Sequence, residues 1–171
     1  GERFWPMTHG KFPKYRIQFN GKDSLLQKTY QRLLRVYHKD SITVVPTEPH
    51  SKLIREELPQ MKRRNLLIEP ARNNTAAAIF LSCEVIRDRF GGEETVSFFP
   101  ADHLIQNESE FTKTMRSTIR LAETKDLLVT VGIQPTFPAT GYGYIQSGAG
   151  LDGFAGAYRV KRFIEKPDHK K

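Results

Sequence analysis

The chain has 171 residues and carries 27 Lys and Arg against 19 Asp and Glu, a formal net charge of +8. Hydrophobic residues make up 38% and charged residues 27%, which is typical of a folded domain and excludes extensive disorder. No apolar run approaches the roughly 20 residues of a membrane helix, and the lone Cys83 excludes an internal disulfide and a cysteine-rich zinc site. We expect one cytoplasmic domain, residues 1–171, that binds no membrane.

The basic residues are concentrated at the two ends of the chain. Residues 1–16 carry a net charge of +3 and residues 158–171 a net charge of +4, which leaves +1 for the stretch between them. A nucleic-acid-binding protein usually spreads its bases along one helix or face and interleaves them with aromatic residues. The clustering at the termini suits a small polyanion better, so we expect no nucleic acid partner.

The first half of the chain alternates helical patterns with short apolar runs. Ser24 and Gln27 have the spacing of a capping box, which predicts the start of a helix. The apolar stripe of that helix is Tyr30, Leu33, Leu34 and Tyr37. Residues 41–45 and 65–69 are predicted strands, and between them residues 49–58 are predicted to form a helix that ends before a proline.

A longer helix is predicted to begin at Asn74 or Thr75 and to end at Gly91-Gly92. Its apolar positions are Ala76, Ile79, Phe80, Cys83, Ile86 and Phe90. Residues 95–99 form the next predicted strand, and Asn107 is predicted to start another helix. The apolar positions of this last helix are Phe111, Met115, Ile119 and Ala122.

The alternation changes after a predicted strand at residues 126–133. Residues 141–146 and 158–164 are predicted strands with no helix between them. Strands that alternate with helices imply right-handed crossovers and a mostly parallel sheet covered on both faces. We therefore expect an α/β fold with a doubly wound, mostly parallel, Rossmann-like sheet, helices on both of its faces, and added C-terminal strands for which an antiparallel orientation is one option.

In such a sheet, ligands bind beyond the carboxyl ends of the strands, which selects four places in this chain. The first is the N-terminal segment, where Gly1, Glu2 and Arg3 precede Lys14. Backbone amides and cations of this kind can gather around phosphates. A mobile basic terminus is the alternative, and composition alone does not decide between the two.

The second place lies between Glu69 and the helix that follows it. The free amides of a first turn at Asn74, Thr75 and Ala76 favour polar ligand groups, and the small alanine side chain lets a ligand approach the backbone. Ordinary helix capping is the simpler explanation of this segment taken alone.

The third place is Asp102, directly beyond the apolar run at residues 95–99. A carboxylate there is suited to Mg²⁺, which prefers few protein carboxylates together with substrate phosphates and water. A role as a turn residue explains the same aspartate equally well.

The fourth place is the exit of the last predicted strands. Gly141, Tyr142 and Gly143 alternate glycine with an aromatic residue, which allows close approach of a ligand and offers a hydroxyl to sugar oxygens. Glu165 suits sugar hydroxyls and Lys166 suits a phosphate. A hairpin packed on the core and a solvated ion pair explain these residues without any ligand.

Taken together and in this order, these segments resemble the bacterial mannose-1-phosphate guanylyltransferases of the nucleotidyltransferase family. The distinctive pieces are residues 1–6, 69–76, 99–103, 140–145 and 163–167. The resemblance covers the whole chain and implies an incomplete catalytic domain, with the family's first strand and initial glycines before Gly1 and a further region after Pro167. Because that first strand is central, we expect unpaired strand edges. Around Lys14 the chain departs from the family pattern, since Tyr15-Arg16 replace a usual Gln-Phe.

The resemblance also implies a role for each candidate residue. The nucleotide-binding residues are Gly1 and Glu2 of the glycine-rich loop, and Glu69, Asn74, Thr75 and Ala76 around the guanosine. The residues on the reacting phosphates are Arg3, Lys14 and Lys166. The sugar-binding residues are Gly141, Tyr142, Gly143 and Glu165, and Asp102 is the Mg²⁺ ligand.

The implied reaction is the transfer of GMP from GTP to α-D-mannose 1-phosphate, which gives GDP-mannose and pyrophosphate with Mg²⁺ as cofactor. GTP, mannose 1-phosphate and GDP-mannose are then the partners, and formation of a homo-oligomer stays open. One alternative is another sugar-1-phosphate nucleotidyltransferase that uses dTTP, UTP or CTP, which residues 69–76 argue against. The other is a non-catalytic nucleotide-sugar-binding domain.

Overall fold

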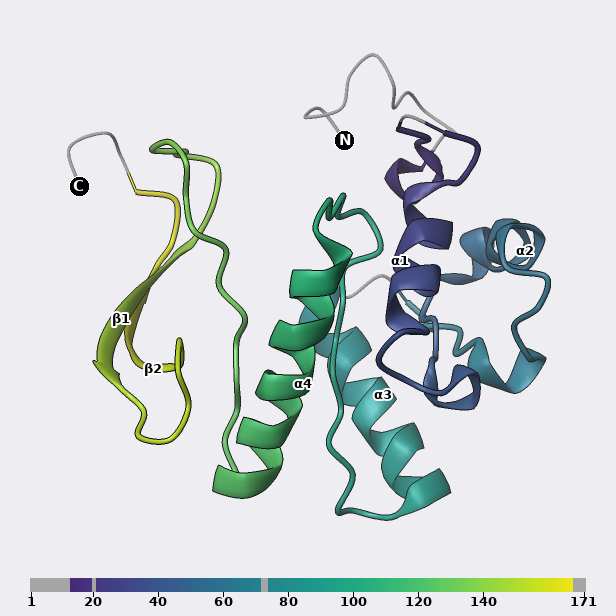
Figure 1. The fold of residues 1–171 in the computed structure, drawn as a ribbon. Helices are drawn as coiled ribbons and strands as arrows, with labels where there is room; N and C mark the ends of the chain where they lie inside the picture. Colours follow the sequence, from purple (N-terminus) through teal and green to yellow (C-terminus); the bar gives the residue numbers. More distant parts are fainter. Residues whose placement is uncertain (1–12, 20, 72–73, 168–171) are drawn as a thin grey trace. The chain divides into compact units, whose positions relative to one another are not determined.

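The computed structural model describes residues 13–19, 21–71 and 74–167 of the chain. Within them lie the helices α1 (Leu25–Leu33), α2 (Glu48–Glu57), α3 (Asn74–Phe90) and α4 (Glu108–Lys125) and the strands β1 (Tyr144–Gly150) and β2 (Tyr158–Ile164) (Figure 1). The chain divides into two compact units, Gly1–Met115 and Arg116–Lys171, so the boundary falls inside α4. No helix in the described part of the chain is long and apolar enough to span a membrane.

A capping box starts α1, as the spacing of Ser24 and Gln27 predicted. The backbone N–H of Gln27 donates to Ser24 Oγ at 3.2 Å, and the Ser24 N–H donates to Gln27 Oε1 at 2.9 Å. These two bonds satisfy amides that the start of a helix leaves without partners. The helix ends at Leu33, so Leu34 lies beyond it and is exposed, although the sequence placed it on the apolar stripe.

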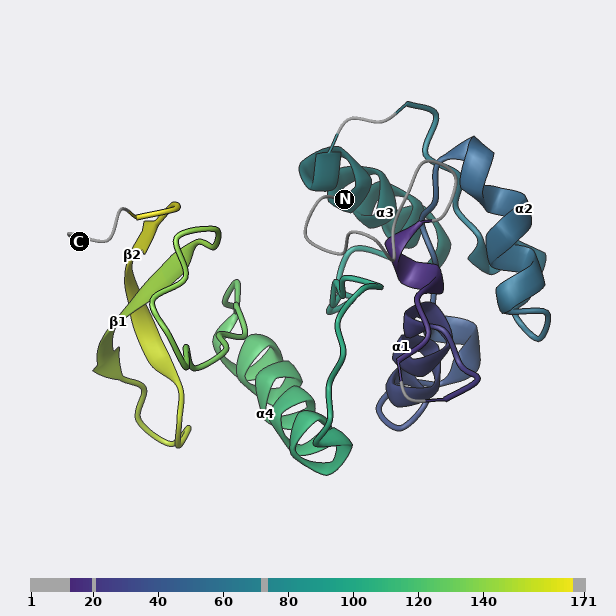
Figure 2. The ribbon, with the colours of Figure 1, turned by 90° about the horizontal axis from the view of Figure 1, so that it is seen from above.

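The core of the first unit contains buried residues of both α1 and α2. Figure 2 shows the backbone of these two helices from above. The buried residues of the core are Leu26, Tyr30, Leu33, Ile42, Ile54 and Leu58. Burial of one such side chain is worth about 1.5–3 kcal/mol, so this cluster is the main stabilising contact of the unit. α2 is shifted by one residue from the predicted range, because Glu48 and Pro49 both lie in its first turn.

Two of the predicted strands pair in parallel over a short stretch. Val44 bridges Leu66 and Thr47 bridges Glu69. The N–H of Leu67 donates to Val44 O at 2.9 Å, and the N–H of Glu69 donates to Pro46 O at 2.8 Å. α2 lies between the two paired segments in the sequence, which is the order of a strand–helix–strand crossover.

The expected mostly parallel sheet is not formed by the described residues, which contain these parallel bridges and one antiparallel hairpin. Residues 95–99 and 127–133 are extended, but neither segment is assigned as a strand. An extended segment becomes a strand only where a neighbouring backbone completes its hydrogen bonds, and no described segment does so here. The apolar side chains of residues 127–133 are largely exposed, with Leu128 fully exposed and Ile133 78% exposed, whereas Phe99 of the other segment packs against the core.

The two long helices begin where the sequence predicted. α3 runs from Asn74 to Phe90, and at Gly91, with φ +100°, the chain leaves the helix while its N–H donates to Arg87 O at 2.9 Å. The predicted apolar stripe of α3 is only partly covered in the described structure: Ile79, Cys83 and Ile86 are half-buried, whereas Phe80 is 68% and Phe90 61% exposed.

α4 is capped by Asn107, whose Oδ1 accepts a hydrogen bond from the Glu110 N–H at 3.0 Å. Of its predicted apolar positions, Met115 is buried and Phe111 packs against the core of the first unit.

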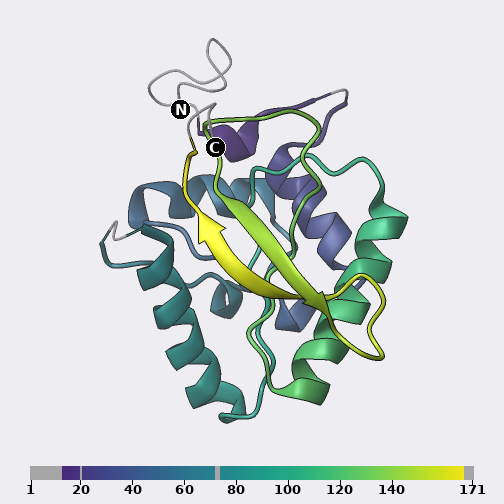
Figure 3. The same ribbon diagram turned by 90° about the vertical axis from the view of Figure 1, so that its left-hand side faces the viewer.

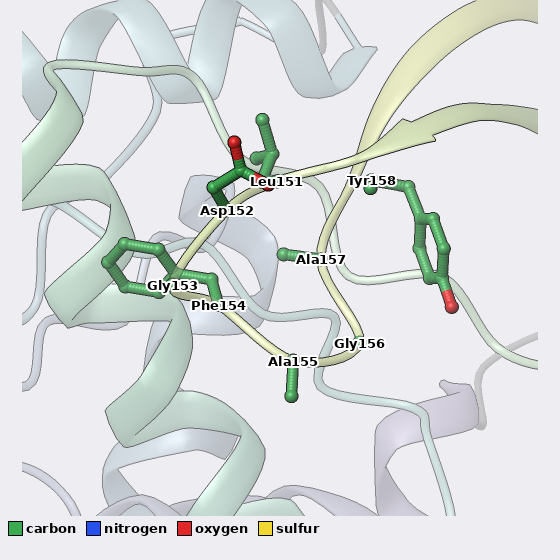
Figure 4. Close-up of a pocket in the computed structure, with 9 residues that line it drawn as sticks. Leu151, Asp152, Gly153, Phe154, Ala155, Gly156, Ala157 and Tyr158 are labelled. Atoms are coloured by element: carbon green, nitrogen blue, oxygen red, sulfur yellow. The ribbon is translucent and has the colours of Figure 1, made fainter.

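In the second unit, β1 and β2 form an antiparallel hairpin in which Tyr144 pairs with Ile164 and Gln146 with Arg162 (Figure 3). The predicted strand at residues 141–146 therefore begins three residues later than expected, and the antiparallel option is confirmed. The loop that joins the strands surrounds an open cavity of about 690 Å³ lined by residues 150–158 (Figure 4). Its lining includes one carboxylate, Asp152, and no basic side chain, so it does not suit a phosphate.

Candidate functional site

The hairpin brings together three of the residues that the sequence assigned to sugar and phosphate binding. Because Tyr144 pairs with Ile164, Gly143 lies opposite Glu165. A Cβ atom at Gly143 would lie only 3.0 Å from Glu165 Oε2, so the absence of a side chain makes room for this carboxylate. Lys166 Nζ lies 3.3 Å from Glu165 Oε1, which places an acid and a base next to each other at the end of β2.

The backbone at this point is strained. Lys166 has φ +37°, in the left-handed region, although it is not a glycine and precedes Pro167, which disfavours helical conformations before it. Such a conformation costs roughly 1–2 kcal/mol. On the other side of the hairpin, the Tyr144 hydroxyl donates to Ala139 O at 2.8 Å and fixes the turn that carries Gly141 and Tyr142.

The Glu165 side chain is 74% exposed, and Lys166 is exposed as well. Their mutual ion pair therefore contributes little to stability, and both groups are available to a ligand. A carboxylate that accepts from hydroxyls beside an ammonium that binds an anion is a combination suited to a sugar phosphate.

The parallel bridges position the second group of candidate residues, in the first unit. Glu69 is the last bridged residue of its segment, and the chain then leads to the start of α3. Asn74, Thr75 and Ala76 form the exposed first turn of this 17-residue helix. Asn74 has φ +63°, which asparagine tolerates better than most residues. The end of the bridged segment and the first turn of α3 thus lie close in the sequence, and their role in nucleotide binding stays a prediction.

Lys14 lies in a short 3-10 helix, Lys14–Arg16, in which it is half-buried. Pro13 precedes this helix, and its carbonyl accepts a hydrogen bond from the Arg16 N–H at 3.0 Å. The neighbours of Lys14 bind α2. The Tyr15 hydroxyl lies 3.0 Å from His50 Nδ1, and Arg16 Nε donates to Glu57 Oε1 at 2.9 Å.

Asp102 lies in the turn that follows the extended segment at residues 95–99, and its side chain is half-buried. An aromatic chain anchors this segment, because the Phe99 ring centroid lies 5.9 Å from that of Tyr37 and 6.0 Å from that of Phe111. The start of the turn that carries Asp102 is therefore held by the packing of Phe99.

Sequence reasoning missed the side chains that support these residues. Arg32 is buried, donates to Thr29 Oγ1 at 3.0 Å, and its guanidinium lies 5.1 Å from the Phe111 ring centroid. Burial lowers the pKa of Arg32, and the charge of Glu108 opposes this shift. His50 and Glu57 were missed too, because they lie 35 and 41 residues from their partners and carry no local signal.

Gly1, Glu2 and Arg3 lie outside the described residues, so their predicted roles stay predictions. The remaining candidate residues fall into both units. Those of the first unit are Lys14, Glu69, Asn74, Thr75, Ala76 and Asp102. Those of the second unit are Gly141, Tyr142, Gly143, Glu165 and Lys166.

No three His, Cys, Asp or Glu side chains in the described part of the chain gather so that they could hold a metal ion. An all-protein metal site is thus not found there. The single carboxylate of Asp102 still fits Mg²⁺, because this ion commonly takes one or two protein carboxylates and completes its shell with substrate phosphates and water.

Comparison with known proteins identifies the family. The family model described as nucleotidyl transferase matches residues 1–171. The chain belongs to the nucleotidyl transferase family. Members of this family have a Rossmann-like α/β fold, of which the described residues form four helices, the parallel bridges and the hairpin.

The chain is also similar to curated proteins over nearly its whole length. It is 37% identical over 174 residues to a mannose-1-phosphate guanylyltransferase of Klebsiella pneumoniae and to one of Escherichia coli, with 100% of this chain and 36% of each relative covered. It is 39% identical over 170 residues to the xanthan biosynthesis protein XanB of Xanthomonas campestris pv. campestris (strain B100), with 98% and 35% covered. The chain thus spans about a third of the length of these relatives.

Proposed function

We propose that the protein transfers GMP from GTP to α-D-mannose 1-phosphate in the cytoplasm and releases pyrophosphate and GDP-mannose. The observation that carries the proposal is the group formed by Gly143, Glu165 and Lys166 in a chain of the nucleotidyl transferase family. The names of the relatives support the choice of guanosine and mannose.

The proposed chemistry needs no general base. A sugar phosphate is already an anion near neutral pH, so its oxygen can attack the α-phosphorus of GTP directly while pyrophosphate leaves. Catalysis then consists of positioning and of neutralising the charge on the phosphates. Arg3 and Lys14 would hold the triphosphate, and Lys166 would guide the attacking sugar phosphate.

The other candidate residues would select the two substrates. The sugar would contact Gly141, Tyr142 and Gly143 at the turn before β1, and Glu165 would accept hydrogen bonds from its hydroxyls. The nucleotide would contact Gly1, Glu2, Glu69, Asn74, Thr75 and Ala76. Asp102 would hold Mg²⁺, which neutralises phosphate charge when it is bound.

We also propose that the extended segments at residues 95–99 and 127–133 are strands of a doubly wound, mostly parallel sheet in the whole protein. Support comes from the strand–helix–strand order around α2 and from the exposed apolar side chains of Phe98, Leu128 and Ile133. Pairing with neighbouring strands would bury these side chains and satisfy the backbone groups.

The decisive experiment measures pyrophosphate release by the full-length protein with Mg²⁺ across a matrix of nucleoside triphosphates and sugar 1-phosphates. We expect a strong signal with GTP and mannose 1-phosphate only. A preference for dTTP, UTP or CTP would replace the proposed substrates by those of a sister enzyme. Binding of GDP-mannose without pyrophosphate release from any pair would make the protein a nucleotide-sugar-binding protein and overturn the proposal.

Replacement of Lys14 tests its role on the phosphates. In the full-length protein we expect Lys14→Ala to lower kcat/KM for GTP by on the order of a hundredfold, since the substituted ammonium faces developing phosphate charge. The melting temperature should change little, and Lys52→Ala on the exposed face of α2 serves as the matched control. Equal losses of turnover and of folded protein would remove Lys14 from the site.

A further inference from the structure

The 3-10 helix that carries Lys14 is too short to hold its own shape. It has three residues, and its backbone bonds run from the Arg16 N–H to Pro13 O at 3.0 Å and from the Ile17 N–H to Lys14 O at 3.1 Å. A single turn of this kind fixes several dihedral angles for very few hydrogen bonds, so its stability must come from contacts elsewhere. The side chains that follow Lys14 supply such contacts.

Tyr15 makes the first contact, with the first half of α2. Its hydroxyl lies 3.0 Å from His50 Nδ1, and the two rings meet edge to face with their centroids 5.7 Å apart. Burial raises the pKa of Tyr15 above its ordinary value, which already keeps the hydroxyl protonated at neutral pH. The contact therefore combines one hydrogen bond with an aromatic packing geometry that restricts the direction of the side chain.

Arg16 makes the second contact, with the last residue of α2. Its Nε donates to Glu57 Oε1 at 2.9 Å, and the Glu57 side chain is only 12% exposed. Glu57 is itself held, because Gln27 Nε2 of the capping box of α1 donates to its backbone oxygen at 2.9 Å. The partial burial and this second support distinguish the pair from a mobile surface ion pair.

These two contacts fix the orientation of the turn as well as its position. His50 and Glu57 are seven residues apart on one helix, so they are separated by about 10 Å along its axis. Consecutive residues of the turn thus bind α2 at two distant points, and a turn attached in this way cannot rotate about either one. This attachment, together with the hydrogen bond from the Leu25 N–H to Ile17 O at 3.0 Å, constrains the direction in which the Lys14 side chain leaves the backbone.

We propose that Tyr15 and Arg16 are positioning residues: they attach the turn that carries Lys14 to α2 and so hold the Lys14 side chain in the orientation needed to bind the phosphates of the nucleotide. The inference rests on the proposed function for the role of Lys14, while the contacts of Tyr15 and Arg16 are structural. α2 would thus contribute to nucleotide binding through Tyr15 and Arg16, without a contact of its own with the substrate.

The test is a charge swap in the full-length protein, with Arg16→Glu, Glu57→Arg and the double variant. Three quantities are measured: the melting temperature, the hydrogen exchange rate of the Ile17 amide, and the dissociation constant of GTP. We expect each single variant to bind GTP on the order of tenfold more weakly and to exchange the Ile17 amide faster, and we expect the double variant to recover both. Tyr15→Phe, which keeps the ring, should give a smaller effect of the same kind.

The control is a swap of another ion pair of the same unit. Lys62 Nζ lies 2.8 Å from Asp40 Oδ1, and Lys62→Glu combined with Asp40→Lys should leave the Ile17 exchange rate and the GTP affinity unchanged. If GTP affinity falls in the single variants and the double variant does not recover it, the proposal is overturned. The same holds if the single variants leave the Ile17 exchange rate unchanged.

Lys14→Ala separates this inference from the proposed function. One outcome is that Lys14→Ala weakens GTP binding but Arg16→Glu, which loosens the turn, leaves it unchanged. In that case Tyr15 and Arg16 do not position Lys14, so the inference fails while the proposed function stands. A third outcome is that neither Lys14→Ala nor Arg16→Glu affects GTP binding, although the Ile17 amide exchanges faster in Arg16→Glu and recovers in the double variant. The proposed role of Lys14 then fails, and so does the part of the inference that concerns the nucleotide.

Discussion

At Gly143 the absence of a side chain leaves space for the Glu165 carboxylate at the end of the hairpin. Residue 143 lies opposite Glu165, and the space that a Cβ atom would occupy is 3.0 Å from the Glu165 carboxylate. The glycine thus lets the carboxylate lie over the backbone, where a sugar could reach it from solvent. Strain at Lys166, the next residue after Glu165, supports a functional role, because such conformations persist mainly where the surroundings require them.

Substitution of this glycine should affect substrate use more than folding. In the full-length protein, Gly143→Ala should displace the Glu165 carboxylate and raise KM for mannose 1-phosphate by on the order of tenfold or more, with little change in melting temperature. Gly92→Ala is the matched control, because a Cβ atom there meets nothing within 4 Å. An unchanged KM in Gly143→Ala would show that Glu165 does not contact the sugar.

A second residue-scale feature is the carboxylate of Asp40, which lies within 2.9 Å of Lys62 Nζ through both of its oxygens. The hydrogen bond from Lys62 holds the pKa of Asp40 below its ordinary value, with help from the charges of Lys62, Arg64 and His38. The stabilisation from this pair is therefore present above the unfolded-state pKa of aspartate and is lost as the pH falls through the lower native pKa.

Titration of Asp40 by NMR should show this directly. We expect its side-chain pKa to lie below the ordinary value in the native chain and to rise towards that value in Lys62→Gln. Lys52→Gln removes a lysine that has no such contact in the described structure and should not move it. A pKa of Asp40 that is equal in all three proteins would contradict the assignment of Lys62 as the main cause.

Among the elements, α1 and α2 begin in different ways. α1 has a complete capping box, whereas the side chain of Thr47, the residue before α2, makes no capping hydrogen bond. α2 relies instead on Pro49 in its first turn, which fixes a helical φ, and on the burial of Ile54. The start of α1 matters for the site as well, since Gln27 of the capping box also binds the backbone of Glu57.

Removal of the two caps should therefore have unequal effects. We expect Ser24→Ala to lower the free energy of unfolding by about 1 kcal/mol, and by more if the half-buried Gln27 N–H stays without a hydrogen-bond partner. Thr47→Ala should cost clearly less, because no hydrogen bond of its side chain is lost. Urea unfolding followed by circular dichroism measures both, and equal losses would show that the capping box does not stabilise α1.

At the scale of the whole molecule, the paired and unpaired extended segments differ in their backbone hydrogen bonds. The amides of Leu67 and Glu69 donate to the neighbouring segment, whereas residues 128–133 have no assigned pairing among the described residues. This segment also exposes several large apolar side chains together, namely Leu127, Leu128, Val131 and Ile133, which marks a surface that another segment normally covers. The proposed doubly wound sheet would remove both features at once.

Hydrogen exchange can test that sheet. We expect the amide of Leu67 to be protected in the 171-residue chain, while the amides of Leu128 and Ile133 exchange at rates close to those of an unfolded peptide. In the full-length protein the amides of Leu128 and Ile133 should become protected as well. Fast exchange at both positions in the longer protein would exclude residues 127–133 from a paired strand.

Signals that lie within one turn of chain were sufficient to predict the local elements. The capping box at Ser24, the cap at Asn107 and the glycine end of α3 are each made by residues at most four positions apart, so the sequence determined them. The candidate residues around Asp102 and Glu165 were likewise proposed from short motifs, and their roles stay predictions.

The tertiary structure alone decided which distant residues meet. Three features depend on pairs of residues that lie 20 to 80 positions apart in the sequence. They are the register that places Gly143 opposite Glu165, the contacts of Tyr15 and Arg16 with α2, and the packing of buried Arg32 against Phe111. A strand likewise exists only when another backbone completes its hydrogen bonds, which is why the strands predicted at residues 95–99 and 126–133 are not formed by the described residues. Local propensity depends on neighbours in the chain, whereas pairing depends on neighbours in space.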